Sequence, residues 1–117
     1  MKKILITGGT GFIGAAISNY FVNKGYDITI LDNNSRGNIS RIKHNRKNIK
    51  FIKGDVTKYK DVYKACKGKN CIFHLAAVNG TKYFYEKPDV VLDVSCKGVI
   101  NVIDVAKKLK IKNIFLA

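Results

Sequence analysis

The chain has 117 residues, of which 46% are hydrophobic and 26% are charged. This composition is typical of a globular domain and excludes disordered and collagen-like classes. No apolar run reaches the roughly 18 residues that a membrane span needs. The apolar start of the chain stops at Thr7-Gly8-Gly9, which is too short for a secretion signal. We therefore expect a single cytoplasmic domain over 1–117.

Charge is strongly basic, with 22 Lys and Arg against 8 Asp and Glu and a formal net charge of +14. Such a field attracts anions, including nucleic acid. The densest basic run comprises Arg36, Arg41, Lys43, Arg46, Lys47, Lys50 and Lys53. Aromatic residues are not interleaved with this run as a stacking groove would need, and no nucleic-acid-binding signature is present. A nucleic-acid module is therefore the weaker alternative to a solvated, lysine-rich surface.

Cysteine and histidine patterns give no sign of a metal site. Cys66, Cys71 and Cys96 are odd in number and form no CxxC pair, which argues against both a disulfide framework and structural zinc. We expect each to be a small buried hydrophobic residue. His44 and His74 lie far apart in the sequence.

Apolar runs alternate along the chain with amphipathic stretches. Strands are expected over 3–7, 27–31, 49–53, 71–75 and 113–116, with a loop over 33–48. Helices are expected over 11–24, 58–67 and 88–110. Alternating strands and helices indicate an α/β fold with a parallel sheet in the order 3-2-1-4-5. A ligand crevice is then expected at the carboxyl ends of the first and fourth strands.

The first two helices carry start, stop and face signals. In the first, Ile13, Ile17, Tyr20 and Phe21 are spaced as one apolar face, and Gly25 stands where a helix stop is expected. In the second, Thr57 is placed to cap the helix. Its predicted apolar face comprises Tyr59, Val62, Tyr63 and Cys66.

The last helix, opened by Pro88 and Asp89, carries two apolar stripes. The first comprises Val91, Val94, Gly98, Val102, Val105 and Leu109. The second comprises Leu92, Cys96, Val99 and Ile103. One stripe is enough to cover a sheet, so the second predicts burial against further chain or a partner subunit.

Three glycines, Gly8, Gly11 and Gly14, follow the first strand and open the first helix. Gly8 suits the tight turn, Gly11 lets a pyrophosphate approach the backbone, and Gly14 allows close packing of helix on strand. The helix N-terminus then offers N–H groups and partial positive charge to the phosphates.

Two acids follow the second and third strands. Asp32 lies 18 residues after Gly14, where an acid accepts hydrogen bonds from adenosine ribose and repels a 2′-phosphate. This favours NAD, although Arg36 is close enough to keep NADP as an alternative. Asp55 is positioned to accept a hydrogen bond from adenine, but an Asp at a strand end is also a common turn residue.

The segments TGGTGFIG (7–14), LDNNSRG (31–37), GDV (54–56) and HLAA (74–77) together resemble the extended short-chain dehydrogenase/reductase family. The resemblance is closest to its NAD-dependent nucleotide-sugar epimerase/dehydratase branch and covers nearly the whole chain. It implies a Rossmann-type three-layer fold that binds NAD and, in the full-length protein, a nucleotide-sugar substrate.

The resemblance also implies roles for individual residues. The implied pyrophosphate cradle comprises Gly8, Gly11, Phe12, Ile13 and Gly14. The implied adenosine and nicotinamide contacts comprise Asp32, Asn34, Ser35, Arg36, Asp55, Val56, Leu75, Ala76 and Ala77. Thr81 and Lys82 are candidates for a nucleotide diphosphate. The helix 88–110 corresponds to one that this family often uses in a homodimer interface.

Two departures from the family pattern stand out. Ser95 and Val99 occupy positions where the family usually has Asn and Thr. The family's catalytic Ser and Tyr-x-x-x-Lys follow the fifth strand, beyond Ala117, so we expect no catalytic residue in this chain and no activity from it alone. Tyr20/Lys24, Tyr63/Lys67 and Tyr83/Lys87 match that spacing but lie in the wrong elements. A non-catalytic dinucleotide sensor remains the alternative to an enzyme fragment.

Overall fold

The computed structural model of the chain describes residues 2–33, 49–76 and 85–117. Five parallel strands form one sheet: β1 (Lys3–Thr7), β2 (Asp27–Asp32), β3 (Ile49–Lys53), β4 (Cys71–His74) and β5 (Asn113–Leu116). Their order is β3-β2-β1-β4-β5, which confirms the predicted topology. The predicted loop over 33–48 lies outside the described residues from 34 onward.

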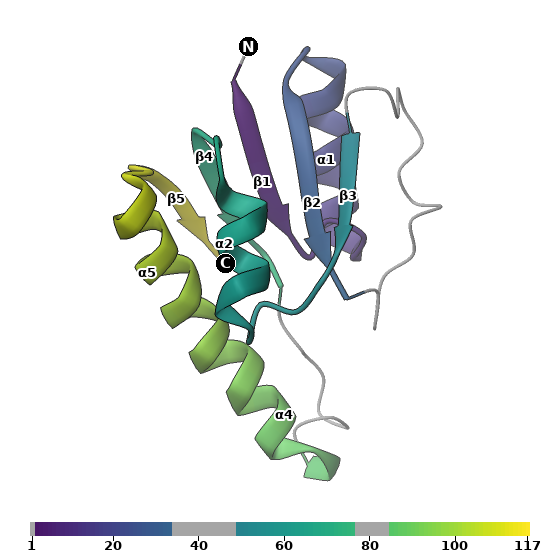
Figure 1. Cartoon of the computed structure of the whole chain (residues 1–117). Helices are drawn as coiled ribbons and strands as arrows, with labels where there is room; N and C mark the ends of the chain where they lie inside the picture. The colour runs from purple at the N-terminus through teal and green to yellow at the C-terminus, as the bar shows by residue number, and fades with distance from the viewer. Residues whose placement is uncertain (1, 34–48, 77–84) are drawn as a thin grey trace.

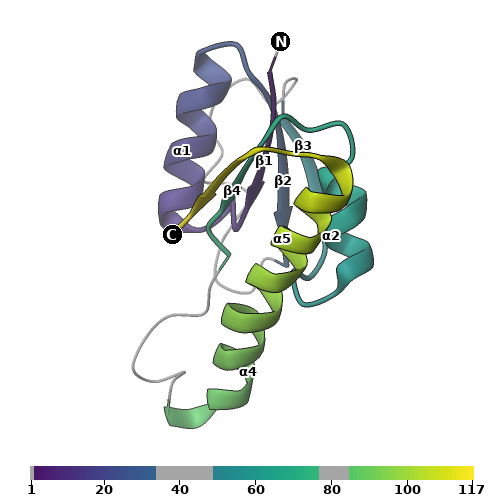
Figure 2. The ribbon, with the colours of Figure 1, turned by 90° about the vertical axis from the view of Figure 1, so that its left-hand side faces the viewer.

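Helices cover the sheet on both faces (Figure 1). α1 (Phe12–Asn23) lies on one face, whereas α2 (Tyr59–Cys66) and α5 (Gly98–Leu109) lie on the other, as the turned view shows (Figure 2). The predicted helix 88–110 consists of α4 (Pro88–Leu92), a π-helical segment η3 (Asp93–Lys97) and α5. α4 extends beyond the carboxyl edge of the sheet (Figure 2).

Alternation along the buried strands divides the core into two layers. Ile4 and Ile6 face α1, whereas Leu5 between them joins the layer under α2 and α5. All three are at most 3% exposed. A strand covered on both faces needs apolar residues at every position, which explains the continuous apolar run of β1.

The predicted apolar face of α1 is confirmed for Ile17 and Phe21, which pack against the core, and wrong for Ile13 and Tyr20. Ile13 and Tyr20 are exposed, and Ile17 and Phe21 are only partly buried. The buried residues are Gly14, Ala15, Ser18 and Val22. Ser18 meets its own hydrogen-bonding need by donating from Oγ to the Gly14 carbonyl oxygen at 2.7 Å. Small side chains let the helix axis lie close to the sheet, so the bulky residues flank the contact instead of filling it.

The predicted helix cap at Thr57 is also wrong. α2 begins with Lys58 at its N-cap position and has no side-chain cap. The Thr57 hydroxyl donates instead to Asp55 Oδ1 at 2.8 Å. On the predicted α2 face, Val62 and Cys66 are buried, whereas Tyr59 is exposed. The Gly25 stop is confirmed, since Gly25 has φ +87° directly after the α1 C-cap.

The two stripes of the last helix separate as predicted. Gly98, Val102 and Val105 of the first stripe are buried in α5. In the second stripe, Leu92 and Ile103 are 60% and 38% exposed. What covers this second stripe stays a prediction.

The cysteines differ from one another in burial. All three are free thiols. Cys66 is buried, and that burial raises the pKa of its thiol to about 12, so it is inert as a nucleophile at neutral pH. Cys96 is exposed, which contradicts the expectation that every cysteine is buried. Across the described ranges, the helices are all too short or too polar to cross a membrane.

Candidate functional site

The glycine-rich turn lies at the carboxyl end of β1, between β2 and β4. Gly8 has φ +72°, and a Cβ there would lie 2.9 Å from the backbone of Ala76 at the end of β4. Its N–H donates to the Leu31 carbonyl oxygen at 2.9 Å. Glycine is required at this position both by the left-handed backbone and by the close approach of the neighbouring strand.

The N-terminus of α1 is built to meet an anion. Its N-cap residue, Gly11, has extended backbone; no side chain caps the helix, and no acid lies in its first turn. The first amides of a helix lack intrahelical partners and carry the positive end of the helix dipole. A Cβ on Gly11 would meet only the Gly8 carbonyl oxygen, at 3.3 Å. The residues present therefore fit a pyrophosphate that lies against bare backbone.

Gly14 and Gly9 fix the position of the turn. A Cβ on Gly14 would overlap the Gly8 carbonyl oxygen and lie 2.9 Å from Gly9 Cα. Gly14 therefore allows α1 to approach the turn backbone itself, whereas the sequence predicted an approach to the strand. Gly9, to which the sequence analysis assigned no role, would place a Cβ 2.6 Å from Ile30 Cγ2.

Asp32 binds the glycine-rich turn as well as standing at the expected ribose position. Its carboxylate Oδ2 accepts hydrogen bonds from the Thr10 N–H at 3.0 Å and from the Thr10 hydroxyl at 2.5 Å. Both side chains are buried. No local pattern in the sequence indicates this role of Thr10, because its partner lies 22 residues away on β2. This pair holds the glycine-rich turn against the end of β2.

Asp55 and Val56 line the edge beyond β3. Asp55 Oδ1 accepts from the N–H and the hydroxyl of Thr57, at 2.9 and 2.8 Å, so this carboxylate has a turn role. Val56 is 6% exposed, and its carbonyl oxygen accepts from Asn101 Nδ2 at 2.8 Å. Its side chain lies in the core, and contacts of either residue with adenine stay predictions.

Thr7 and His74 form a clasp between β1 and β4 that the sequence analysis did not predict. The Thr7 Oγ1 atom accepts from the N–H groups of Leu75 and Ala76 at 3.0 and 3.1 Å. It lies 2.8 Å from His74 Nδ1. Leu75 and Ala76 are the residues expected on the nicotinamide side, so the clasp fixes the backbone of that side.

Hydrogen-bond accounting gives the tautomer of His74. A hydroxyl has one proton and two lone pairs. Because two amides occupy the Thr7 lone pairs, its proton is donated to His74 Nδ1, which must be unprotonated. Burial lowers the pKa of His74 below its ordinary 6.5. A protonated ring would place a third donor against the Thr7 Oγ1 atom, whose two lone pairs are already occupied, and would break the clasp.

We expect the free energy of unfolding to fall as the pH drops below about 6.5. His74 then binds a proton in the unfolded chain, whereas in the folded chain it stays neutral because its pKa is lowered. The stabilisation that comes from neutral His74 is fully present above that pH. It is lost as the pH falls from 6.5 to the lowered pKa of His74 in the folded chain. Urea unfolding at pH 7.5 and 5.0 measures it. In His74→Asn, whose side-chain oxygen still accepts from Thr7, the loss should be smaller. Equal losses in both proteins would contradict the clasp, since His44 is common to both.

Several predicted site residues lie outside the described residues: Asn34, Ser35, Arg36, Ala77, Thr81 and Lys82. Tyr83, of the Tyr83/Lys87 pair to which no catalytic role is assigned, also lies outside them. The other two Tyr-x-x-x-Lys pairs are ordinary helix-surface contacts. Lys24 Nζ lies 5.5 Å from the Tyr20 ring, and Lys67 Nζ lies 5.3 Å from the Tyr63 ring. Within the described ranges, no cluster of three acidic, Cys or His side chains is suited to a metal ion.

Several known proteins are similar to this chain in sequence and in fold. UDP-N-acetyl-alpha-D-glucosaminuronate decarboxylase of Bacillus cytotoxicus is 32% identical over 97% of this chain and 36% of its own length. An epimerase of Methanothermobacter thermautotrophicus superposes with TM-score 0.92 at 28% identity, over 98% of this chain and 34% of that one. The enzyme WbmH of Bordetella bronchiseptica, solved with NAD+, superposes with TM-score 0.84 at 25% identity. The match covers 97% of this chain and 38% of WbmH.

The chain spans about a third of the length of these relatives. The family model for the NAD dependent epimerase/dehydratase family matches residues 4–117, which include the glycine-rich turn, Asp32 and the clasp. This chain is therefore a member of the NAD dependent epimerase/dehydratase family.

Proposed function

We propose that the chain binds NAD as the N-terminal part of an oxidoreductase that acts on a nucleotide sugar. The observation that carries the proposal is the uncapped α1 N-terminus behind Gly8 and Gly11. It offers amide donors and partial positive charge at the topological switch point of the sheet, where dinucleotides bind in doubly wound folds. The structure of WbmH with NAD+ supports the same choice of cofactor.

Each part of the dinucleotide has a partner in this chain. The amides of Phe12, Ile13 and Gly14 would hold the pyrophosphate. The carboxylate of Asp32 would accept from the ribose hydroxyls while it stays bonded to Thr10. Asn34, Ser35 and Arg36 would lie near the ribose, and Asp55 and Val56 near adenine. Leu75, Ala76 and Ala77 would line the nicotinamide.

When bound, NAD supplies a hydride acceptor and donor. The residues of this chain bind and orient it, and we assign none of them a catalytic role. A nucleotide-sugar substrate is supported by the named activity of the Bacillus cytotoxicus relative. A homodimer through 88–110 is supported by the exposure of Leu92, Ile100 and Ile103.

Calorimetry with NAD and NADP tests the proposal. We expect NAD to bind at least about tenfold more tightly, because a buried carboxylate at Asp32 repels a 2′-phosphate. Asp32→Asn should weaken NAD binding and narrow the difference between the two cofactors. Asp27→Asn removes the same charge at the other end of β2 and should leave both affinities unchanged. Absence of heat with millimolar NAD would overturn the proposal, and equal affinity for both cofactors would overturn the role of Asp32.

A further inference from the structure

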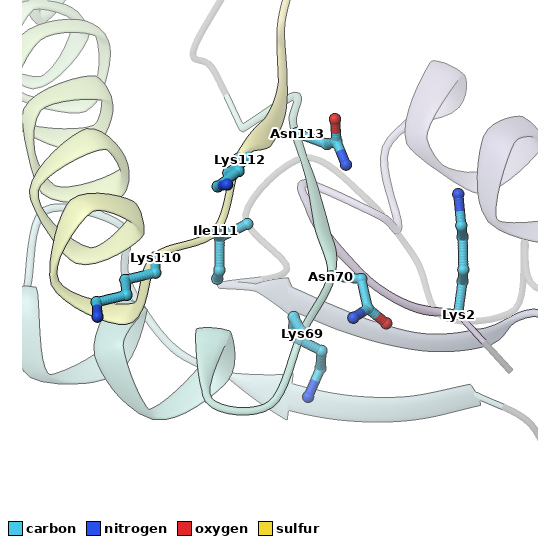
Figure 3. A pocket seen from close by; sticks show the side chains of 7 residues that line it. All are labelled: Lys2, Lys69, Asn70, Lys110, Ile111, Lys112 and Asn113. Atoms are coloured by element: carbon cyan, nitrogen blue, oxygen red, sulfur yellow. The ribbon is translucent and has the colours of Figure 1, made fainter.

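A pocket opens at the amino edge of the sheet, opposite the edge that carries the glycine-rich turn (Figure 3). Its volume is about 540 Å³, within the range of small-molecule sites. Three separate segments line it: the start of β1, the turn between α2 and β4, and the turn between α5 and β5. The lining residues are Lys2, Lys69, Asn70, Lys110, Ile111, Lys112 and Asn113.

The backbone around this pocket is fixed by hydrogen bonds between the segments. The Asn70 N–H donates to the Lys3 carbonyl oxygen at 2.8 Å, and Asn70 Oδ1 accepts from the Lys3 N–H at 2.9 Å. The Ile111 N–H donates to the Ala106 carbonyl oxygen at 2.9 Å. The backbone of the pocket is therefore held by the fold, whereas the lysine side chains can change rotamer.

Positive charge in the pocket is poorly balanced. Among the described residues, no acid lies within ion-pair distance of any of its four lysines. Lys69 is half-buried and donates from Nζ to the Lys67 carbonyl oxygen at 3.2 Å. Its pKa is lowered mainly by burial; the charge of Asp27 opposes this, and Lys50 and Lys3, which do not line the pocket, lower it by smaller amounts. A bound anion would supply the negative charge that no described acid within ion-pair distance supplies to the pocket lysines.

Helix electrostatics explain only part of the cluster. Cations are favoured at a helix C-terminus, which accounts for Lys110 after α5. Lys2 and Lys112 flank strands, and Lys69 lies in the turn before β4. Strands have only small net dipoles. Lys69 also follows the C-terminus of α2 and donates to the carbonyl oxygen of its C-cap residue, Lys67. Helix electrostatics therefore account for Lys69 and Lys110 but not for Lys2 and Lys112.

We propose that this lysine pocket binds a compact soluble anion with two or more phosphate groups. Lysines act as flexible point charges for phosphate. In Figure 3 the Lys2 and Lys69 side chains point away from each other, so binding one anion requires them to change rotamer. Asn70 and Asn113 add neutral amides. The lining has no aromatic residue on which bases could stack, which disfavours single-stranded nucleic acid. The proposal is independent of NAD binding, which uses the opposite edge.

Titration of the ¹⁵N-labelled chain with tripolyphosphate, in the presence of NAD, tests this proposal. We expect saturable shifts of the Lys69, Asn70, Ile111 and Asn113 amides. Lys69→Gln with Lys112→Gln should weaken binding at least about tenfold. Lys60→Gln with Lys64→Gln removes two exposed α2 lysines outside the pocket. This pair should change the affinity for tripolyphosphate less than about twofold. Lys69→Arg with Lys112→Arg keeps the charge and should retain binding.

Three results would overturn the proposal. Equal weakening by the two glutamine pairs would show a general effect of net charge. Shifts confined to Gly11, Phe12 and Ile13 would place the anion at the α1 N-terminus instead. Tighter binding of a DNA duplex, or of vesicles of anionic lipid, than of tripolyphosphate through the same amides would show that the occupant is a macromolecule or a membrane.

Discussion

Gly11→Val should abolish measurable NAD binding while the chain stays folded. Inside the protein the new side chain meets little, since a Cβ at Gly11 has only the Gly8 carbonyl oxygen within 4 Å, and the φ of −69° is open to any residue. We expect a stability loss of about 1 kcal/mol from the poorer N-cap. Toward the ligand, the branched side chain would stand where the pyrophosphate meets the amides. Calorimetry and urea unfolding separate the two effects.

The matched control is Ala16→Val, which introduces the same side chain at an exposed position of α1. It should cost about 0.5 kcal/mol of stability through helix propensity and leave NAD affinity unchanged. If Gly11→Val bound NAD as tightly as Ala16→Val, the pyrophosphate would not lie against Gly11.

Gly14→Val should destabilise the fold itself by about 2 kcal/mol or more. Its Cβ would overlap the Gly8 carbonyl oxygen and crowd Gly9 Cα, and backbone atoms in a fixed turn cannot yield as a flexible side chain does. Overpacking of this kind costs about 1–3 kcal/mol, which exceeds the propensity gained when glycine leaves a helix. The midpoint of urea unfolding measures the loss.

The same Ala16→Val control applies to the Gly14 variant. A Gly14→Val protein as stable as the control would mean that α1 can move away from the turn at no cost. The amides of the helix would then not be held in place for a ligand, and the close approach that the glycine allows would have no function.

Much of the fold was predictable because its signals are local. β1 and β3 have the predicted bounds, since apolar runs ended by turn residues mark strands directly. The sheet order follows from alternating strands and helices together with right-handed crossovers. Gly8 was predictable for a similar reason: a tight turn between strand and helix requires its positive φ.

The failed predictions concern packing distance and long-range contacts. The buried face of α1 was missed because hydrophobic spacing ranks Ile13 and Tyr20 above Gly14 and Ser18, whereas a helix lying close to a sheet selects the small residues. Thr7 and His74 are 67 residues apart, and no local pattern indicates that pairing. The Thr57 hydroxyl could either cap α2 or bond to Asp55. It donates to the Asp55 carboxylate, so α2 is left without a side-chain cap.

The clasp also shows which kind of interaction the local sequence does not reveal. Thr7 is a polar residue in a fully buried strand position, which is the one local indication that a specific partner exists, because buried polar groups are hydrogen-bonded. The partner itself becomes evident only when β1 and β4 lie side by side.

A ¹⁵N NMR titration of the chain with NAD tests the central claim most directly. If the opening turn of α1 receives the two phosphates, the amide signals of Phe12, Ile13 and Gly14 will move together and saturate, with Thr10 following through its bond to Asp32. Signals from that turn that stay fixed at millimolar NAD, or shifts confined to other elements, would contradict the account.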